Sequence, residues 1–363
     1  MIKATLVAAA ASLALSGAAL AETLTPIDDM SEGWNTIAPG GDTLCAMGTP
    51  YSFHVKPGAR EKAMVFLNGG GACGAGQTCD ASVEPTTYVP LAELPHNDPR
   101  SRGGAFAQDY PENPFSAWTQ VFVSYCTGDV HMGANDKTYA KPDGSKITVH
   151  HRGKANTMSA LGWLFDNVKA PETVFVSGGS AGAVSSPVYA GVVQEAYPEA
   201  EVIQFAGGAG GYRVGANPEL SENLGIYTDL PDWSSMQALS ADTSSFDDFY
   251  VATATQFPQI KFRQFNTAYD SVQKQFLTLL GSDSEVYPLL KANLDDLATE
   301  IGTFRSFTAS GTFHTLLRFD EMYAFEAEGI RAVDWVRDIA TGKDVASVTC
   351  ANDEGGCTGG PAE

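Results

Sequence analysis

Short apolar runs alternate with a segment of helical periodicity along the first half of this chain. Residues 63–67 form an apolar run that ends in glycines, 120–125 alternate, and 173–176 are rich in β-branched side chains. All three runs predict strands. Apolar side chains recur at helical spacing over 158–168, and Pro171 stops that run, which predicts a helix between the last two strands.

Later runs continue the same alternation. Residues 202–205, 260–266 and 304–308 are further strand candidates, each followed by glycine-rich or polar loop material. A strand, helix, strand order is typical of a parallel sheet, so we expect an α/β fold with a mostly parallel central sheet flanked by helices. Long loop insertions are expected around 69–116, and a partial cap over 207–257. Ligand chemistry on such a sheet is expected where its strands end.

Ser180 lies in a Gly-x-Ser-x-Gly pattern between the strand candidate 173–176 and a small-residue, apolar helix candidate over 183–193. This setting is typical of a nucleophile elbow, in which Gly178 and Gly182 are needed because a side chain at either position would collide with the neighbouring strand or helix. The pattern also occurs by chance in glycine-rich loops, and this chain has 37 glycines. The flanking strand and helix favour the catalytic interpretation.

A serine nucleophile needs a base, and only His314 follows Ser180 in the chain. The order serine, acid, histidine belongs to the α/β-hydrolase architecture, so we predict His314 as the base, with a structural loop histidine as the alternative. Asp270 comes four residues after a strand candidate, in a loop that can meet the imidazole. Other carboxylates in the interval lie in acidic stretches typical of a solvated surface. Ser180, Asp270 and His314 therefore form the predicted triad.

The oxyanion of a tetrahedral intermediate needs backbone donors. Gly70 and Gly71, at the end of the first strand, and Ala181, just after the serine, can supply them. The spacing of Gly69, Gly71 and Gly74 also matches a dinucleotide-binding Gly-x-Gly-x-x-Gly loop. That motif must open a helix directly, and no apolar periodicity follows here, so the oxyanion interpretation is favoured.

Several motifs together resemble the pectin acetylesterase and Notum carboxylesterase family of α/β-hydrolases. They are Phe-Leu-Asn-Gly-Gly-Gly-Ala-Cys at 66–73, Tyr-Cys-Thr-Gly-Asp-Val-His-Met-Gly at 125–133, His-Arg-Gly at 151–153 with Asn156, and the serine elbow. The resemblance covers residues from about 33 to 314. Within the family, the chain resembles a secreted bacterial member.

In that family the glycine-rich stretch supplies the oxyanion hole, which the resemblance assigns to Gly70, Gly71 and Ala181. Ser180 is then the nucleophile, and Asp270 and His314 look like the family's acid and base. Gly71 stands where Notum-like members have a bulky aromatic residue, so the size of the acyl chain does not carry over.

Two further residues belong to the family's bacterial pattern. Asp129 and His131 are expected to line or brace the site, and a satisfied structural pair remains the alternative.

The chain begins with Met1 and Lys3, followed by an apolar stretch over 4–20 and a small-residue Ala-Leu-Ala ending at Ala21. This is the pattern of a secretory signal, so we expect residues 1–21 to be cleaved, with an uncleaved membrane anchor as the alternative. No linker divides residues 22–363, which we expect to form a single domain. The predicted location is secreted or periplasmic.

Six cysteines behind an export signal indicate disulfides. Two pairs of cysteines lie close together in the sequence, and a disulfide within each pair would close a short loop. The remaining two cysteines then form a natural third bridge, although six cysteines permit about 15 connectivities. The chain has no Cys-x-x-Cys and no histidine pair at i, i+4 spacing that would indicate zinc, so no metal is expected. The candidate pairs are Cys45 with Cys126, Cys73 with Cys79, and Cys350 with Cys357.

The formal net charge is −21, and cleavage would remove Lys3 and leave −22. Such a charge repels phosphates and anionic lipids, so we expect no nucleic-acid partner and no membrane association after signal cleavage. It also disfavours polyanionic, de-esterified pectin at low salt.

The residues and the resemblance together predict an esterase acting through an acyl-enzyme, without a cofactor, on a small ester or an acetylated glycan. A secreted serine peptidase and a catalytically silent carbohydrate-binding protein on the same scaffold remain alternatives. The natural acyl group, the alcohol, the presence of a lid and the oligomeric state stay open.

Overall fold

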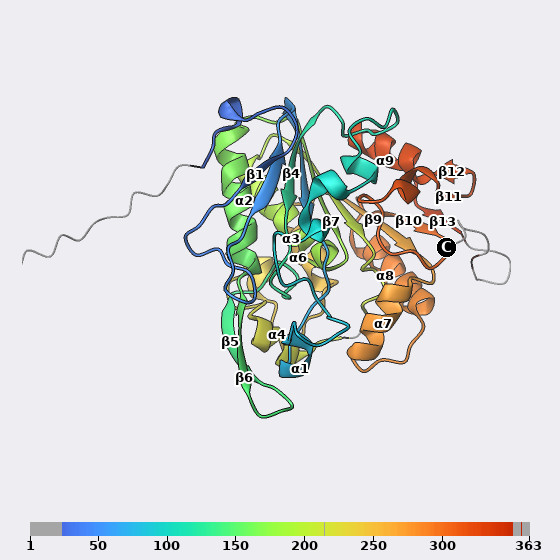
Figure 1. The fold of residues 1–363 in the computed structure, drawn as a ribbon. Helices are drawn as coiled ribbons and strands as arrows, with labels where there is room; N and C mark the ends of the chain where they lie inside the picture. The colour runs from blue at the N-terminus through green and yellow to red at the C-terminus, as the bar shows by residue number, and fades with distance from the viewer. Residues whose placement is uncertain (1–23, 214, 351–356, 358–363) are drawn as a thin grey trace, which may run out of the picture.

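The computed structural model describes residues 24–213, 215–350 and Cys357 (Figure 1). The predicted signal segment 1–21 lies outside them. No helix within the described residues is long and apolar enough to cross a membrane.

A mostly parallel sheet forms the centre of the described chain. Its nine strands follow the order β1-β2-β4-β3-β7-β8-β9-β10-β13. Only the β1–β2 and β2–β4 pairs are antiparallel, and they lie at one edge. The strands are β1 Asn35–Ile37, β2 Phe53–Lys56, β3 Ala59–Leu67, β4 Trp118–Val123, β7 Thr173–Gly179, β8 Glu201–Gly207, β9 Lys261–Thr267, β10 Arg305–Ala309 and β13 Val348–Thr349.

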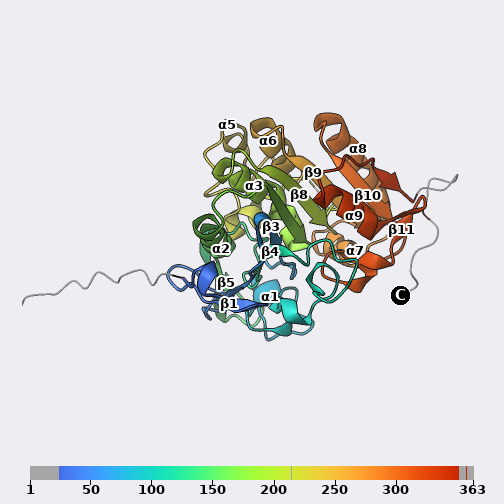
Figure 2. The same cartoon turned by 90° about the horizontal axis from the view of Figure 1, so that it is seen from above.

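Helices cover both faces of this sheet. Successive residues of β3 belong to different hydrophobic clusters. Val65 belongs to the cluster that includes residues of α2, α3, α6 and α8, whereas Phe66 belongs to the cluster that includes residues of α9. Figure 2 shows α3, α6 and α8 along one side of the strands. These helices are α2 Gly153–Asn167, α3 Ala181–Ala196, α6 Asp248–Gln256, α8 Val286–Glu300 and α9 Ala332–Ala340.

The predicted α/β class and its elements are confirmed. The six strand candidates fall on β3, β4, β7, β8, β9 and β10, and the two helix candidates fall on α2 and α3. The inner strands are buried on both faces, as in β7, where every residue is buried. Such strands have continuous apolar runs, which made them visible in the sequence.

The long insertions carry short elements of their own. The segment between β3 and β4 and the segment between β8 and β9 hold small helices, and a hairpin of β5 and β6 projects from the body (Figure 1). The remaining elements are α1 Gly76–Cys79, α4 Pro218–Leu224, α5 Ser234–Gln237, α7 Ser271–Leu279, β5 Asn135–Ala140, β6 Lys146–His151, β11 Glu326–Ala327, β12 Ile330–Arg331, and the 3-10 turns Ile27–Asp29, Pro95–Asn97, Pro99–Ser101, Gly104–Phe106 and Asp320–Tyr323.

The three predicted disulfides are present. Cys45 pairs with Cys126, Cys73 with Cys79, and Cys350 with Cys357. The first bridge joins segments 81 residues apart, and it ties the loop before β2 to the residues that follow β4.

Candidate active site

Ser180 lies at the sharp turn between β7 and α3, at the carboxyl edge of the sheet. Its backbone has φ 55° and ψ −120°, a conformation that residues with side chains rarely adopt and that costs about 1–3 kcal/mol. The Ser180 amide donates to the Gly207 carbonyl (2.8 Å), which ties the turn to the end of β8. A serine on a strained turn between strand and helix has the backbone setting of a nucleophile elbow.

Close contacts explain the glycines around this turn. A Cβ on Gly178 would lie 2.1 Å from the Gly182 carbonyl oxygen, and one on Gly182 would lie 2.0 Å from the Leu67 oxygen. A Cβ on Gly69 would lie 2.9 Å from the Ser180 Cβ. The structure therefore leaves no room for a side chain at these glycines, as the sequence predicted. It also places the end of β3 directly beside the serine.

The structure brings Asp270 and His314 together, although they are 44 residues apart. His314 Nδ1 lies 2.7 Å from Asp270 Oδ2, and the Asp270 side chain is fully buried. Asp270 also begins α7: its Oδ1 accepts from the amides of Val272 and Gln273, and its Oδ2 accepts from the Gln273 side chain (2.9 Å). Four hydrogen bonds thus hold the carboxylate, which in turn places the proton of the neutral imidazole on Nδ1.

Ser180 and His314 flank the same glycine pair. Ser180 bonds to Gly207, and a Cβ on Gly208 would lie 3.0 Å from the His314 ring. His314 Nε2 is buried and has no hydrogen-bond partner among the described residues. The structure contains no Ser180–His314 hydrogen bond between these described side chains; such bonds are often long in ligand-free enzymes and tighten when substrate binds.

The three predicted oxyanion amides are near the serine. Gly71, Ser180 and Ala181 line one pocket, and Gly70 adjoins Gly71. Within the described part of the chain, the amides of Gly70, Gly71 and Ala181 have no backbone or side-chain acceptor. Free amides beside a serine are the groups that a developing oxyanion requires.

Asp129 and His131 do not line the pocket beside Ser180, whereas Val130 between them does. The two side chains instead brace the backbone around the site. Asp129 is fully buried and accepts from Thr127 Oγ1 and from the amides of His131 and Gly153. Burial raises the pKa of Asp129 to about 6. Val130 and His131 have φ of 52° and 62°, so the carboxylate holds a strained turn. The two side chains form no pair with each other; each is satisfied separately.

His131 supports the end of β3. Its Nε2 lies 2.8 Å from the Asn68 carbonyl oxygen, and its Nδ1 lies 3.2 Å from Thr157 Oγ1. Because a carbonyl only accepts, Nε2 carries the proton. Burial lowers the pKa of His131 to about 4, so the ring stays neutral at neutral pH.

The pocket beside Ser180 is apolar. It is partly open to solvent, and the space around its walls amounts to about 520 Å³ when the open mouth is included. Apart from Ser180 its walls offer no polar side-chain atom except the Tyr212 hydroxyl. The lining residues are Gly71, Ala72, Val130, Ser180, Ala181, Val184, Tyr212, Leu220, Leu224, Phe246, Phe276 and Leu280.

Sequence reasoning missed most of these walls. Leu220, Leu224 and Phe246 come from the segment expected as a partial cap, and Phe276 and Leu280 come from α7 and the residue after it. Each is one apolar residue in an unremarkable stretch, so no local signal marks it. Their convergence requires the tertiary structure.

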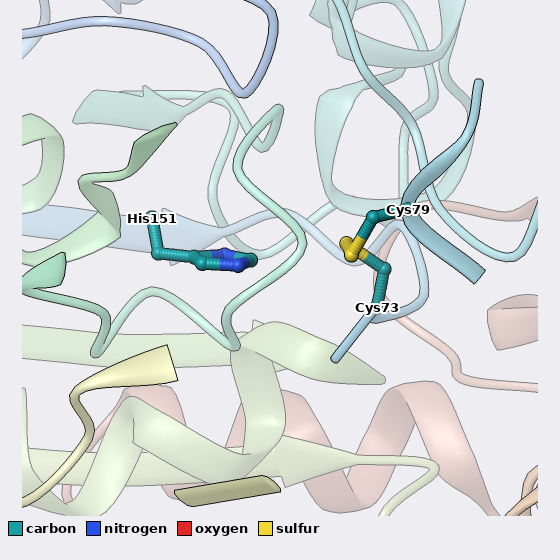
Figure 3. Close-up of side chains that lie close together, drawn as sticks. All are labelled: Cys73, Cys79 and His151. Atoms are coloured by element: carbon teal, nitrogen blue, oxygen red, sulfur yellow. A yellow bond between two sulfur atoms is a disulfide. The ribbon is translucent and has the colours of Figure 1, made fainter. Parts of the chain in front are cut away.

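Cys73, Cys79 and His151 are the one described group of side chains whose ligand atoms could hold a metal; these atoms lie within 4.8 Å of one another (Figure 3). The two sulfurs are joined in a disulfide. His151 contacts the Thr127 carbonyl oxygen and the Tyr139 hydroxyl, each at 2.9 Å. Because the disulfide leaves no thiolate, this group fits a structural role.

These observations define an α/β protein whose mostly parallel sheet carries, at its carboxyl edge, a strained serine, an Asp–His pair and an apolar pocket. The model of the pectinacetylesterase family matches residues 35–296. The chain therefore belongs to the pectinacetylesterase family, which implies carboxylic ester hydrolase activity.

A second comparison supports the family. Over 105 residues the chain is 30% identical to "Inactive palmitoleoyl-protein carboxylesterase notum1b" of Danio rerio, covering 28% of this chain and 74% of that protein. Because that relative is named as inactive, the similarity bears on ancestry, and the activity of this chain depends on its own site.

Proposed function

We propose that this chain is a secreted or periplasmic serine carboxylesterase with a single α/β-hydrolase domain over 22–363, released by cleavage of residues 1–21. Ser180 Oγ attacks the ester carbonyl while His314 Nε2 takes its proton, and the amides of Gly70, Gly71 and Ala181 hold the oxyanion. The alcohol leaves with the proton from His314, and water repeats the sequence to release the acid. Asp270 keeps the imidazole in the required tautomer.

One observation carries this proposal: the strained backbone of Ser180 lies beside His314, whose Nδ1 is held by buried Asp270 and whose Nε2 has no partner in the described chain. His54 Nε2 is also buried without a partner, but its Nδ1 meets only the Thr36 hydroxyl. His314 differs because a buried carboxylate holds its Nδ1 and because it packs beside the glycine pair next to Ser180. An unpaired Nε2 next to a serine elbow supports a general base that awaits substrate.

The pocket and the charge limit the substrate. The walls of the pocket are apolar, and few groups there could bind a charged acyl group. The net charge of −21 disfavours a polyanionic alcohol. We therefore propose neutral esters as substrates, either small esters or acylated, largely uncharged glycans, with no metal or organic cofactor in the reaction.

The test is hydrolysis of a p-nitrophenyl ester series from acetyl to octanoyl, together with acetate release from acetylated glycans. We expect turnover by the wild type and a loss of about 10⁴-fold or more in Ser180→Ala. A fluorophosphonate should label the wild type and not the variant.

Other outcomes would contradict the proposal. A folded wild type that neither hydrolyses esters nor reacts with the fluorophosphonate would be a silent member of the family. Labelling with cleavage of peptides but not of esters would indicate a peptidase.

A further inference from the structure

Every carbonyl at the end of β3 accepts a hydrogen bond from outside its own segment. We name residues 68–71 the oxyanion loop. The donors to its four carbonyl oxygens, in chain order, are His131 Nε2 (2.8 Å), His96 Nε2 (2.9 Å), the Val89 amide (2.8 Å) and the Tyr125 hydroxyl (2.9 Å).

These bonds decide where the loop's amides point. In a trans peptide the carbonyl and the following N–H point in opposite directions. The bond from His96 to the Gly69 oxygen therefore sets the direction of the Gly70 N–H, which has no acceptor within the described chain. Gly69 is also the residue that packs against the Ser180 Cβ.

His96 Nε2 has a second neighbour, the Arg318 guanidinium at 3.0 Å. Arg318 only donates and the Gly69 carbonyl only accepts, so a neutral ring nitrogen can serve one of them. Arg318 already donates to Asn68 Oδ1 (2.9 Å), whereas the Gly69 oxygen has no other donor among the described residues. The proton therefore belongs on His96 Nε2, where it is donated to Gly69.

The surroundings hold His96 in place and uncharged. Asn68 Nδ2 donates to the His96 carbonyl (2.9 Å), so the same asparagine links Arg318 to the backbone of His96. Arg318 is buried and forms no ion pair within the described chain. Burial, followed by the Arg318 charge, lowers the pKa of His96 to about 4.

We propose that His96 is a positioning residue of the reaction, which aims the Gly70 amide at the oxyanion through its hydrogen bond to the Gly69 carbonyl. This rests on the proposed esterase function. The contact exists before substrate binds, so the donor needs no reorganisation in the transition state. His96 itself touches no reacting atom.

The experiment compares His96→Asn with His96→Gln. The glutamine amide reaches the place of Nε2 and can donate to Gly69, whereas the asparagine amide reaches only the place of Nδ1. We expect His96→Asn to lower kcat by about 10-fold to 100-fold with KM changed less than about twofold. Affinity for a trifluoromethyl ketone analogue should fall by the same factor, and His96→Gln should retain most of both.

His54→Gln is the matched control. It replaces a buried imidazole whose Nδ1 contacts Thr36 Oγ1 (3.0 Å) and which has no hydrogen bond to the oxyanion loop within the described chain, so it should keep the wild-type kcat. Equal kcat in folded His96→Asn and the wild type would overturn the inference. So would equal losses in the asparagine and glutamine variants. A wild type without esterase activity would instead contradict the proposed function itself.

Discussion

Asp270 shows how a single side chain can serve the fold and the site together. Its Oδ1 caps α7 through the amides of Val272 and Gln273, and its Oδ2 faces only donors, His314 Nδ1 and the Gln273 amide group. The cap fixes the carboxylate without help from His314. The sequence predicted Asp270 from its place after a strand, but the cap was not foreseen.

Asp270→Asn tests this division. The asparagine oxygen can still cap α7, whereas its NH2 group would meet the two donors and favour the wrong imidazole tautomer. We expect kcat to fall by about 10⁴-fold while the thermal midpoint stays within a few degrees. Asp248→Asn is the control, because Asp248, the first residue of α6, likewise accepts from a backbone amide at the start of a helix, that of Ser245. Near-normal kcat in Asp270→Asn would transfer the role to another acid.

The elements most visible in the sequence are those buried on both sides. β7 and β8 are almost entirely buried and rich in apolar residues because helices cover both faces of the sheet. The β5–β6 hairpin was missed because most of β5 is not buried and lacks apolar alternation. Helix α9 was also missed, although apolar residues at 332, 333, 335, 336, 339 and 340 repeat at helical spacing and could have located it.

The disulfides should stabilise these elements unequally. Cys45–Cys126 closes a loop of 81 residues and Cys73–Cys79 a loop of 6. A crosslink removes more entropy from the unfolded chain when its loop is longer, about 4.5 against about 2 kcal/mol here. Replacing both cysteines of the first bridge by serine should therefore lower the free energy of unfolding more than the same change in the second. Urea unfolding of the two double variants measures this, and the reverse order would contradict it.

The molecule as a whole buries several groups that must titrate when it unfolds. Burial lowers the pKa of His54, His96, His131 and His151 to about 4. An unfolded histidine has a pKa of about 6.5, so between about pH 4 and about pH 6.5 the unfolded chain binds protons that the folded chain does not bind. The stabilisation of the fold by these neutral histidines is present above pH 6.5 and is lost as the pH falls towards 4.

Two carboxyl groups act in the opposite direction. Burial raises the pKa of Asp129 to about 6 and that of Asp247 to about 7, so each stabilises the fold increasingly as the pH falls towards about 4. The four histidines outnumber them, and we expect the free energy of unfolding to fall between pH 6.5 and 4.

His54→Gln removes one of the groups that bind a proton on unfolding. The pH dependence of the free energy of unfolding should therefore become less steep by about 1.4 kcal/mol per pH unit. Urea unfolding of both proteins at several pH values measures it. Identical slopes for variant and wild type would contradict the assignment of a neutral, buried His54.

The sequence by itself determined the class of the protein and the residues of the proposed chemistry, because these depend on local patterns. A buried strand, a glycine-flanked serine and the chain order of Ser180, Asp270 and His314 can each be recognised within a few residues or by elimination. Paired cysteines were likewise few enough to match correctly.

Only the tertiary structure decided the pocket and the supports of the oxyanion loop. Leu220, Phe246 and Phe276 are ordinary apolar residues until folding brings the insertion between β8 and β9 and helix α7 around Ser180. His96 lies 27 residues from the carbonyl that it holds, in a loop without periodicity. Hydrogen bonds and packing between segments far apart in the chain leave no local pattern, because they arise from proximity in space.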